Sequence, residues 1–440
     1  MDRTTLVRAS ALYLPLVTTA VVWLVWPPPP RDRAAAWLAT GWNLAMLPGL
    51  HALALGFGWW SFAVADATLA GFPVDLYLGW AVMWGTLPAL LLAHTRASLI
   101  VIGAIVLDLV AMPAMQPVVS LGRGWLVGEA VAIAACLVPG IALATWTRTG
   151  AHVTRRATLQ AIAFAGLTLG VLPTIILAQS GGSWDALFAR PRWVTSLLVQ
   201  CVAAFGLLGV SAVQEFAMRG DGTPVPFDPP RRFVTSGAYR YVRNPMQLSA
   251  TLVLVAWGAL ASSWWVSAAG AMAVIYGAGF AAGDETADLH KRFGARWQRY
   301  AALVRSWIPR WRPADLADLA PRATLYVAEE CGPCSEVRRW FDTRRPVGLQ
   351  IVAAELHPSR TLSRITYDPG DDTGDAEGVA AIGRALEHIH LGWALLGMFV
   401  RLPIACQFLQ LLTDASGGGE RRVVRYCDRS ASRMAVREVG

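Results

Sequence analysis

The sequence predicts an α-helical polytopic membrane protein with nine or ten spans and a small C-terminal α/β domain. Of the 440 residues, 55% are hydrophobic and only 15% are charged, a composition too apolar for a soluble chain of this length. Apolar runs of about 20 residues, the length that a helix needs to cross a bilayer, recur as far as residue 282. After Pro313 these runs stop, and short apolar strands alternate with amphipathic helices.

The expected spans follow one another closely along the first two thirds of the chain. In order they are Ala9–Trp26, Ala34–Ala63, Leu76–His94, Ala97–Met115, Trp125–Trp146, Leu159–Ala178, Trp193–Met218, Met246–Ser262 and Trp264–Ala282. The second run contains Pro48-Gly49 and could be one tilted helix or two short ones. Pro27 to Pro30 follow the first run without a small-residue cleavage site, so we expect a retained span and no cleaved signal peptide.

Basic residues cluster in three connections, at residues 148–156, 219–243 and 291–312. The positive-inside rule puts all three on the cytoplasmic side. The net charge of +8 is therefore attributed to orientation and to contact with anionic membrane lipid, and no nucleic-acid partner is expected. We predict an integral protein of a bacterial inner membrane with a cytoplasmic C-terminal part. Its expected domains are 1–157 (transmembrane helices of unknown role), 158–313 (a membrane domain that contains the two polar segments described next) and 314–440 (the α/β domain).

Two polar segments flank the last pair of spans. The first, Gly237 to Met246, reads GAYRYVRNPM, and the second runs from Glu285 to Leu289 and continues to Phe293-Gly294. The apolar stretch from Met246 to Ala282 is long enough for a hairpin of two short spans. Its two ends should then return to one membrane face, with Asn244 and Glu285 as neighbours. In the plainer alternative, Arg240 and Arg243 only form a basic collar that orients the spans.

The order Arg-Asn-Pro, apolar hairpin, Glu-x-x-x-Leu-x-x-x-Phe-Gly resembles membrane-embedded methyltransferases over about residues 194–313. The nearest resemblance is to isoprenylcysteine carboxyl methyltransferase and the phospholipid methyltransferases. It implies S-adenosylmethionine as cofactor and a lipid-soluble or amphiphilic methyl acceptor. Asn244 stands at a His position of the family, Gln247 at a Tyr position and Thr286 at the second Glu of a pair. The implied cofactor-binding residues are Tyr239, Arg240, Arg243, Asn244, Pro245 and Glu285.

The implied roles agree with the chemistry of these side chains. A guanidinium group pairs well with the cofactor carboxylate, which suits Arg240 and Arg243. Glu285 could accept hydrogen bonds from the cofactor amino group or ribose. Pro245 would fix the turn at which the chain enters the span.

A Cys-Gly-Pro-Cys motif, Cys331 to Cys334, follows the expected strand Ala323–Val327 and precedes an amphipathic helix. The free N–H groups of a helix N-terminus stabilise a thiolate, so Cys331 would be the attacking thiol and Cys334 the resolving one. A second strand is expected at Leu349–Glu355 and a second helix at Val379–Ile389.

The pattern from about residue 323 to 414 resembles the DCC-type thiol-disulfide oxidoreductases, a thioredoxin-like group. This resemblance implies a thiol or disulfide partner protein and gives Pro403 a place against the disulfide. An inert cysteine pair remains an alternative. So does a zinc site that recruits Cys406, Cys427, His388 or His390, although the spacing fits no common finger pattern and no metal is predicted.

Asp108 lies inside one apolar run and Glu129 near the start of another, and His51 falls within an earlier one. Ionisable residues inside a membrane are functional candidates, but the sequence names no partner for Asp108. The expected function is a membrane S-adenosylmethionine-dependent methyltransferase fused to a dithiol region. Two alternatives stay open: a membrane-anchored thiol-disulfide oxidoreductase on an inactive methyltransferase-like scaffold, and a transport or binding protein.

Overall fold

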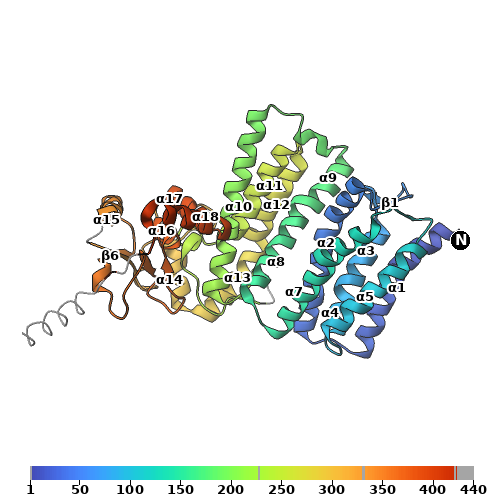
Figure 1. Ribbon diagram of the computed structural model, residues 1–440, viewed down its shortest axis with the longest axis horizontal. Coiled ribbons are helices and arrows are strands. Elements are labelled where there is room, and N and C mark those ends of the chain that lie inside the picture. Colours follow the sequence, from blue (N-terminus) through green and yellow to red (C-terminus); the bar gives the residue numbers. More distant parts are fainter. Residues whose placement is uncertain (1, 226–227, 330–331, 421–422, 424–440) are drawn as a thin grey trace, which may run out of the picture. The chain divides into compact units, whose positions relative to one another are not determined.

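The computed structural model describes residues 2–225, 228–329, 332–420 and 423 (Figure 1). The chain divides into two compact units. The first unit comprises Met1–Val199, Asp221–Arg231 and Leu254–Ala271. The second comprises Gln200–Gly220, Arg232–Val253 and Met272–Gly440. The division at residues 157 and 313 that the sequence suggests stays a prediction.

The first unit is a bundle of helices. They are α1 (Arg3–Val25), α2 (Pro30–Phe57), α3 (Val74–Ala81), α4 (Leu87–Leu91), α5 (Ala97–Ala114), α6 (Trp125–Ala132), α7 (Val138–Thr149), α8 (Val153–Ala165) and α9 (Leu172–Ser180). One-turn π-helical segments make α3–α4, α6–α7 and α8–α9 continuous: η1 (Val82–Thr86), η2 (Ile133–Leu137) and η3 (Gly166–Val171). The short strands β1 (Trp60–Phe62) and β4 (Val119–Leu121) pair antiparallel, as do β2 (Thr68–Leu69) and β3 (Phe72–Pro73). A 3-10 turn, η4, covers Trp184–Leu187.

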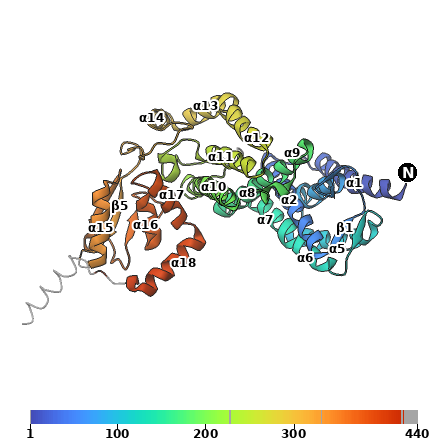
Figure 2. The ribbon, with the colours of Figure 1, turned by 90° about the horizontal axis from the view of Figure 1, so that it is seen from above.

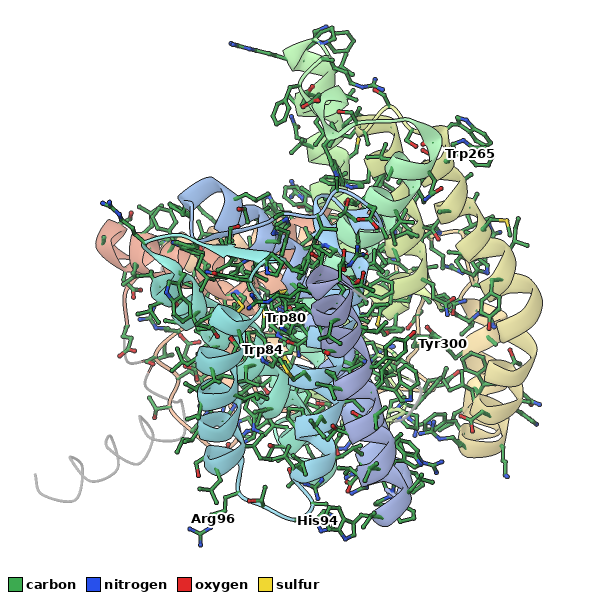
Figure 3. All side chains as sticks on the ribbon, turned by 90° about the vertical axis from the view of Figure 1, so that its right-hand side faces the viewer. Trp80, Trp84, His94, Arg96, Trp265 and Tyr300 are labelled. Atoms are coloured by element: carbon green, nitrogen blue, oxygen red, sulfur yellow. The ribbon has the colours of Figure 1, made fainter. Side chains whose placement is uncertain are left out.

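Helix α2 is central to this bundle and packs against both α3 and α7. Aromatic side chains fill much of the core beside it, and Figure 3 shows Trp80 and Trp84 directed among the helices. His94 and Arg96 lie at one end of the bundle in the same view.

Six helices in the described part of the chain are long and apolar enough to cross a membrane. They are Arg3–Val25, Val74–Leu91, Ala97–Ala114, Trp125–Thr149, Val153–Ser180 and Arg192–Gly220. A bent pair, Leu391–Val400 with Pro403–Gly418, would make seven if it counted as one span. Of the other expected spans, α2 has polar Asn43 and His51 within its apolar stretch, and the last two expected spans form helices of only 16 and 13 residues. Membrane-spanning helices are therefore confirmed, whereas the count of nine or ten stays a prediction.

The second unit combines helices with one sheet. It contains the larger part of α10 (Arg192–Gly220), the first part of α11 (Pro245–Leu260) and the last part of α12 (Trp264–Tyr276). The helices α13 (Ala282–Phe293) and α14 (Ala295–Leu303) follow. The turns η5 (Gly237–Arg240) and η6 (Gly277–Ala281) precede α11 and α13.

The sheet has the order β6 (Leu349–Ala353), β5 (Ala323–Val327), β7 (Thr366–Asp368), β8 (Ala376–Glu377). Strands β5 and β6 are parallel and are joined by α15 (Gly332–Arg344), while β7 pairs antiparallel with both β5 and β8. The helices α16 (Val379–Leu386), α17 (Leu391–Val400) and α18 (Pro403–Thr413) follow, with short turns η7 (Ala354–Leu356) and η8 (Asp414–Gly418). Helices α15 and α16 both pack on the sheet, and Figure 2 shows β5 between them.

The expected strands and helices of this region are confirmed, and two of them end earlier than expected. The second strand stops at Ala353, two residues early, because η7 turns the chain there. The helix expected to reach Ile389 ends at Leu386. The β7–β8 hairpin was not predicted, since its strands are three and two residues long and flank an acidic loop.

Candidate functional site

The segment Gly237 to Met246 folds as the turn η5 followed by the first turn of α11, which begins at Pro245 as expected. Gly237 has a φ of +56°, a left-handed conformation that favours glycine. A Cβ atom at this position would also lie 2.7 Å from Cγ of Glu215. Both the backbone and the space therefore require glycine at the start of the motif.

The backbone of the motif is held by the segment that follows α14. Four backbone hydrogen bonds join the two: Arg243 N to Arg305 O (2.9 Å), Asn244 N to Ser306 O (3.2 Å), Arg310 N to Tyr241 O (2.9 Å) and Ala314 N to Arg240 O (2.9 Å). The hydroxyl of Tyr300 in α14 adds a bond to the carbonyl oxygen of Tyr239 (2.8 Å). The loop is thus rigid before any ligand binds.

Arg240, expected at the cofactor, points its guanidinium into the protein. The group donates to the carbonyl oxygens of Ala314 (3.0 Å) and Val347 (3.1 Å) and lies 2.7 Å from Nδ1 of His388. The residue is buried. These bonds attach the motif to the β5–β6 region and leave Arg240 in a structural position.

His388 connects this arginine to the sheet. Nδ1 of His388 lies 2.7 Å from Nη1 of Arg240 and 2.8 Å from the carbonyl oxygen of Val347, and Nε2 lies 2.9 Å from the Tyr367 hydroxyl. Burial, followed by the charge of Arg240, lowers the pKa of His388 well below its usual value. Burial also raises the pKa of Tyr367 to about 12. The imidazole is therefore neutral at physiological pH.

Arg243 is only partly buried, unlike Arg240. Its Nη2 donates to the Ser306 hydroxyl, and its guanidinium lies 5.6 Å from the centre of the Trp297 ring. Asn244 is also partly exposed, whereas Pro245 is buried at the head of α11. The ring of Tyr239 is buried against Phe216.

The two ends of the apolar hairpin meet in the second unit. Gly277, at the end of α12, is buried, and a Cβ there would lie 3.3 Å from both Oε1 of Gln247 and the ring of Trp307. The start of α11 and the end of α12 are therefore in close contact, as the hairpin requires. Glu285 lies in α13, but its side chain is outside the described residues.

The second unit also contains a cavity of about 350 Å³ next to the motif. Charged groups of both signs line it: Arg219, Arg232, Arg240, Arg322 and Arg384 with Asp315, Asp371, Asp372 and Glu387. Ligand sites for small molecules have volumes of about 300–1,000 Å³, so a cofactor could fit. Of the residues expected at the cofactor, Arg240 is among those that line this cavity.

A buried ionic network borders this cavity. Glu215 of α10, fully buried, accepts from Ser236 Oγ (2.7 Å) and pairs with Arg401 (2.9 Å), Arg219 (3.2 Å) and Arg384. Arg401 and Arg384 also pair with Glu387. Glu215 was not among the residues predicted from the sequence, although a lone acidic residue in an apolar run indicates a functional or structural site.

Cys331 lies outside the described residues. Cys334 is half-buried in the first turn of α15 and packs against the core of the sheet. Pro403 opens α18. Across the described residues, no group of three or more His, Cys, Asp or Glu side chains is placed to hold a metal ion. Cys427, offered as a zinc ligand, lies outside those residues as well.

The comparisons with known proteins gave no relative. No family model, no curated protein and no solved structure matches this chain.

Proposed function

We propose that the protein is a membrane S-adenosylmethionine-dependent methyltransferase that acts on an amphiphilic acceptor. The observation that carries the proposal is the contact between the two ends of the α11–α12 hairpin, where Gly277 packs on Gln247. This contact brings the Arg243-Asn244 end of the motif close to the chain that leads into α13. Methyl transfer is an in-line displacement, so its main requirement is a rigid frame that aligns the sulfonium with a nucleophile.

In this proposal the residues of the motif divide into two groups. Arg243 and Asn244 are partly exposed and can reach a cofactor, with Arg243 as the partner of its carboxylate. Glu285 would accept from the cofactor amino group or ribose. Arg240, Tyr239 and Pro245 are buried and act as positioning residues that fix the loop.

The neighbouring cavity is a second place for the cofactor. S-adenosylmethionine carries a carboxylate, an ammonium, a sulfonium and a ribose diol, and the cavity offers both signs of charge. Arg232 and Arg322 are exposed there and could pair with the carboxylate, while Asp372 could accept from the ammonium or the diol. The acceptor would enter from the lipid of a bacterial inner membrane, with the sheet region on the cytoplasmic side.

Binding of S-adenosylmethionine to the detergent-purified full chain, measured by calorimetry, tests the proposal. We expect saturable binding by the wild type. Loss of binding in Glu285→Ala would place the cofactor at the ends of the α11–α12 hairpin. Loss of binding in Asp372→Ala would place it in the cavity. Glu336→Ala, which removes an exposed carboxylate of α15, is the matched control and should bind normally. A folded wild type that does not bind the cofactor would overturn the proposal.

A second activity is favoured by a separate observation. Gly332, Pro333 and Cys334 of the Cys-Gly-Pro-Cys motif begin α15, the helix that joins the parallel strands β5 and β6, and in such a β–α–β context the motif indicates a thioredoxin-like dithiol. The Cys331 thiolate would attack a partner disulfide and release one partner thiolate. Cys334 would then displace the second, so that the partner is reduced and the 331–334 disulfide forms.

Trapping of the mixed disulfide tests this second activity. Cys334→Ser should accumulate a covalent complex with a disulfide substrate, because the resolving thiol is missing. Cys331→Ser should form none, and Cys406→Ser in α18 serves as the control that behaves as wild type. Equal trapping by both motif variants would rule out the assigned roles.

A further inference from the structure

A pair of acidic side chains is buried inside the first unit. Asp108 of α5 and Glu129 of α6 are 2% and 3% exposed, and their carboxyl groups lie close to each other beside one small cavity. Glu129 is thus the partner that the sequence did not reveal for Asp108. Both helices belong to stretches that can cross a membrane, so the pair sits in the apolar part of the protein.

No cation balances the pair within the described part of the chain, where neither carboxyl group forms an ion pair with a Lys, Arg or His. Two ionised carboxylates in contact repel each other, and the apolar surroundings add a large desolvation cost. The contact is therefore most stable when the pair holds at least one proton.

Beside the pair is a very small cavity with unpartnered polar groups on its wall. Its volume of about 10 Å³ is room for about one water molecule. His51 of α2 lines it, 3% exposed, and neither ring nitrogen has a hydrogen-bond partner among the described residues. The Trp84 Nε1 and one oxygen each of Asp108 and Glu129 are likewise unpartnered there.

Aromatic packing fixes the imidazole at this wall. The His51 ring lies 5.0 Å from the Phe62 ring and 5.1 Å from the Phe72 ring, both centre to centre. Trp84 belongs to η1, and η2 follows directly on the helix of Glu129. Such π-helical turns occur often at functional sites. A buried polar group without a partner costs free energy, so its retention in a packed core calls for an occupant.

We propose that Asp108, Glu129 and His51 form a proton-binding site in the membrane, in which the carboxyl pair holds one exchangeable proton and a single water connects it to His51. No bond other than O–H or N–H changes: the proton leaves one carboxyl oxygen for the water as the water passes another to the imidazole. The site is independent of the proposed methyl transfer and gives the N-terminal helices a role in proton uptake.

Other titratable groups around the site are accounted for. The Tyr77 hydroxyl of α3 donates to the carbonyl oxygen of Leu44. The Cys136 thiol of η2 is buried. Arg8 of α1 is paired with Asp66 and Asp75 and with neither acid of the Asp108–Glu129 pair.

Infrared spectroscopy of the detergent-purified full chain tests the proposal. We expect a carbonyl stretching band of a protonated carboxylic acid at neutral pH that shifts in D2O and disappears as the pH is raised. Asp108→Asn and Glu129→Gln, which preserve volume, should each remove this band, and His51→Gln should change the pH at which it disappears. Asp66→Asn, an exposed acid of the same unit, should leave it unchanged.

Two results would overturn the proposal. A wild type without such a band would show that the pair holds no proton. A band that neither shifts in D2O nor responds to pH would show a locked structural pair with no exchangeable proton. Both readings use the wild type, so a variant that fails to fold does not block the test.

Discussion

The two units bury carboxylates in opposite ways. In the second unit, Glu215 and Glu387 pair with Arg219, Arg384 and Arg401, so each buried carboxyl group has at least one cation beside it. In the first unit, Asp108 and Glu129 have each other and no cation among the described residues. A saturated network fixes structure, whereas an unbalanced pair must take up something from outside. The same residue type therefore has a structural role in one unit and a binding role in the other.

The largest effect is expected from Glu215→Gln. The change leaves three arginine side chains around a buried neutral amide, and breaking a buried ion network typically costs about 3–5 kcal/mol. The free energy of unfolding, followed by chemical denaturation in detergent, should fall by that amount. Glu336→Gln, an exposed acid, is the control. A loss below about 1 kcal/mol would mean that the network does not stabilise the fold.

Arg240→Met should have the next largest effect. It keeps the approximate length of the side chain but removes the guanidinium that donates to Ala314 O and Val347 O and contacts His388 Nδ1. Hydrogen bonds to a charged group contribute about 1.5–3 kcal/mol, so we expect a loss of about 3 kcal/mol in the same measurement.

Arg240→Met also separates positioning from cofactor binding. Arg243→Met, at a partly exposed guanidinium, should cost much less stability but weaken S-adenosylmethionine binding more. The reverse pattern would show that Arg240 binds the cofactor and that Arg243 has a structural role.

The pH dependence of stability should show the buried imidazole. The pKa of His388 is lowered in the folded protein, so below about pH 6.5 the unfolded chain binds a proton that the folded one excludes. Stability is full above that pH and falls as the pH drops, by about 2 kcal/mol between pH 6.5 and 5 for one proton.

His388→Gln should remove this loss of stability at low pH, as measured by unfolding at pH 5, 6 and 7. Burial raises the pKa of the neighbouring Glu387, which acts in the opposite direction. The difference between the wild type and the variant therefore isolates the share of His388. Identical pH profiles for the two proteins would show that His388 takes up its proton without unfolding.

Local sequence patterns were enough to predict the secondary-structure elements, but they did not predict which side chains pair with each other. The sequence correctly located the strand Ala323–Val327, the start of α11 at Pro245 and the turn between α11 and α12, because apolar runs and prolines encode these directly. Arg240 was assigned to the cofactor because a guanidinium suits a carboxylate equally well wherever that carboxylate is. Its actual partners lie 74, 107 and 148 residues away in the chain, a separation at which no spacing rule applies.

The acid pair was missed for a related reason. Asp108 and Glu129 belong to different helices, and which faces of two helices meet depends on packing that a single sequence does not show. His51 completes the site from a third helix. The sequence identified these ionisable residues individually, but it did not show that they lie close together in the fold.

The smallest effect is expected from Asp108→Asn, the same acid-to-amide change as Glu215→Gln. If Asp108 carries the proton of the pair, the substitution exchanges one neutral group for another of similar size, and its amide can still donate to Glu129. The free energy of unfolding at neutral pH should then change by less than about 1 kcal/mol. If Glu129 carries the proton instead, Asp108 is ionised and its replacement removes a buried charge, so the stability should rise. The sign of this change, set beside the large loss at Glu215, therefore decides which acid of the pair is neutral.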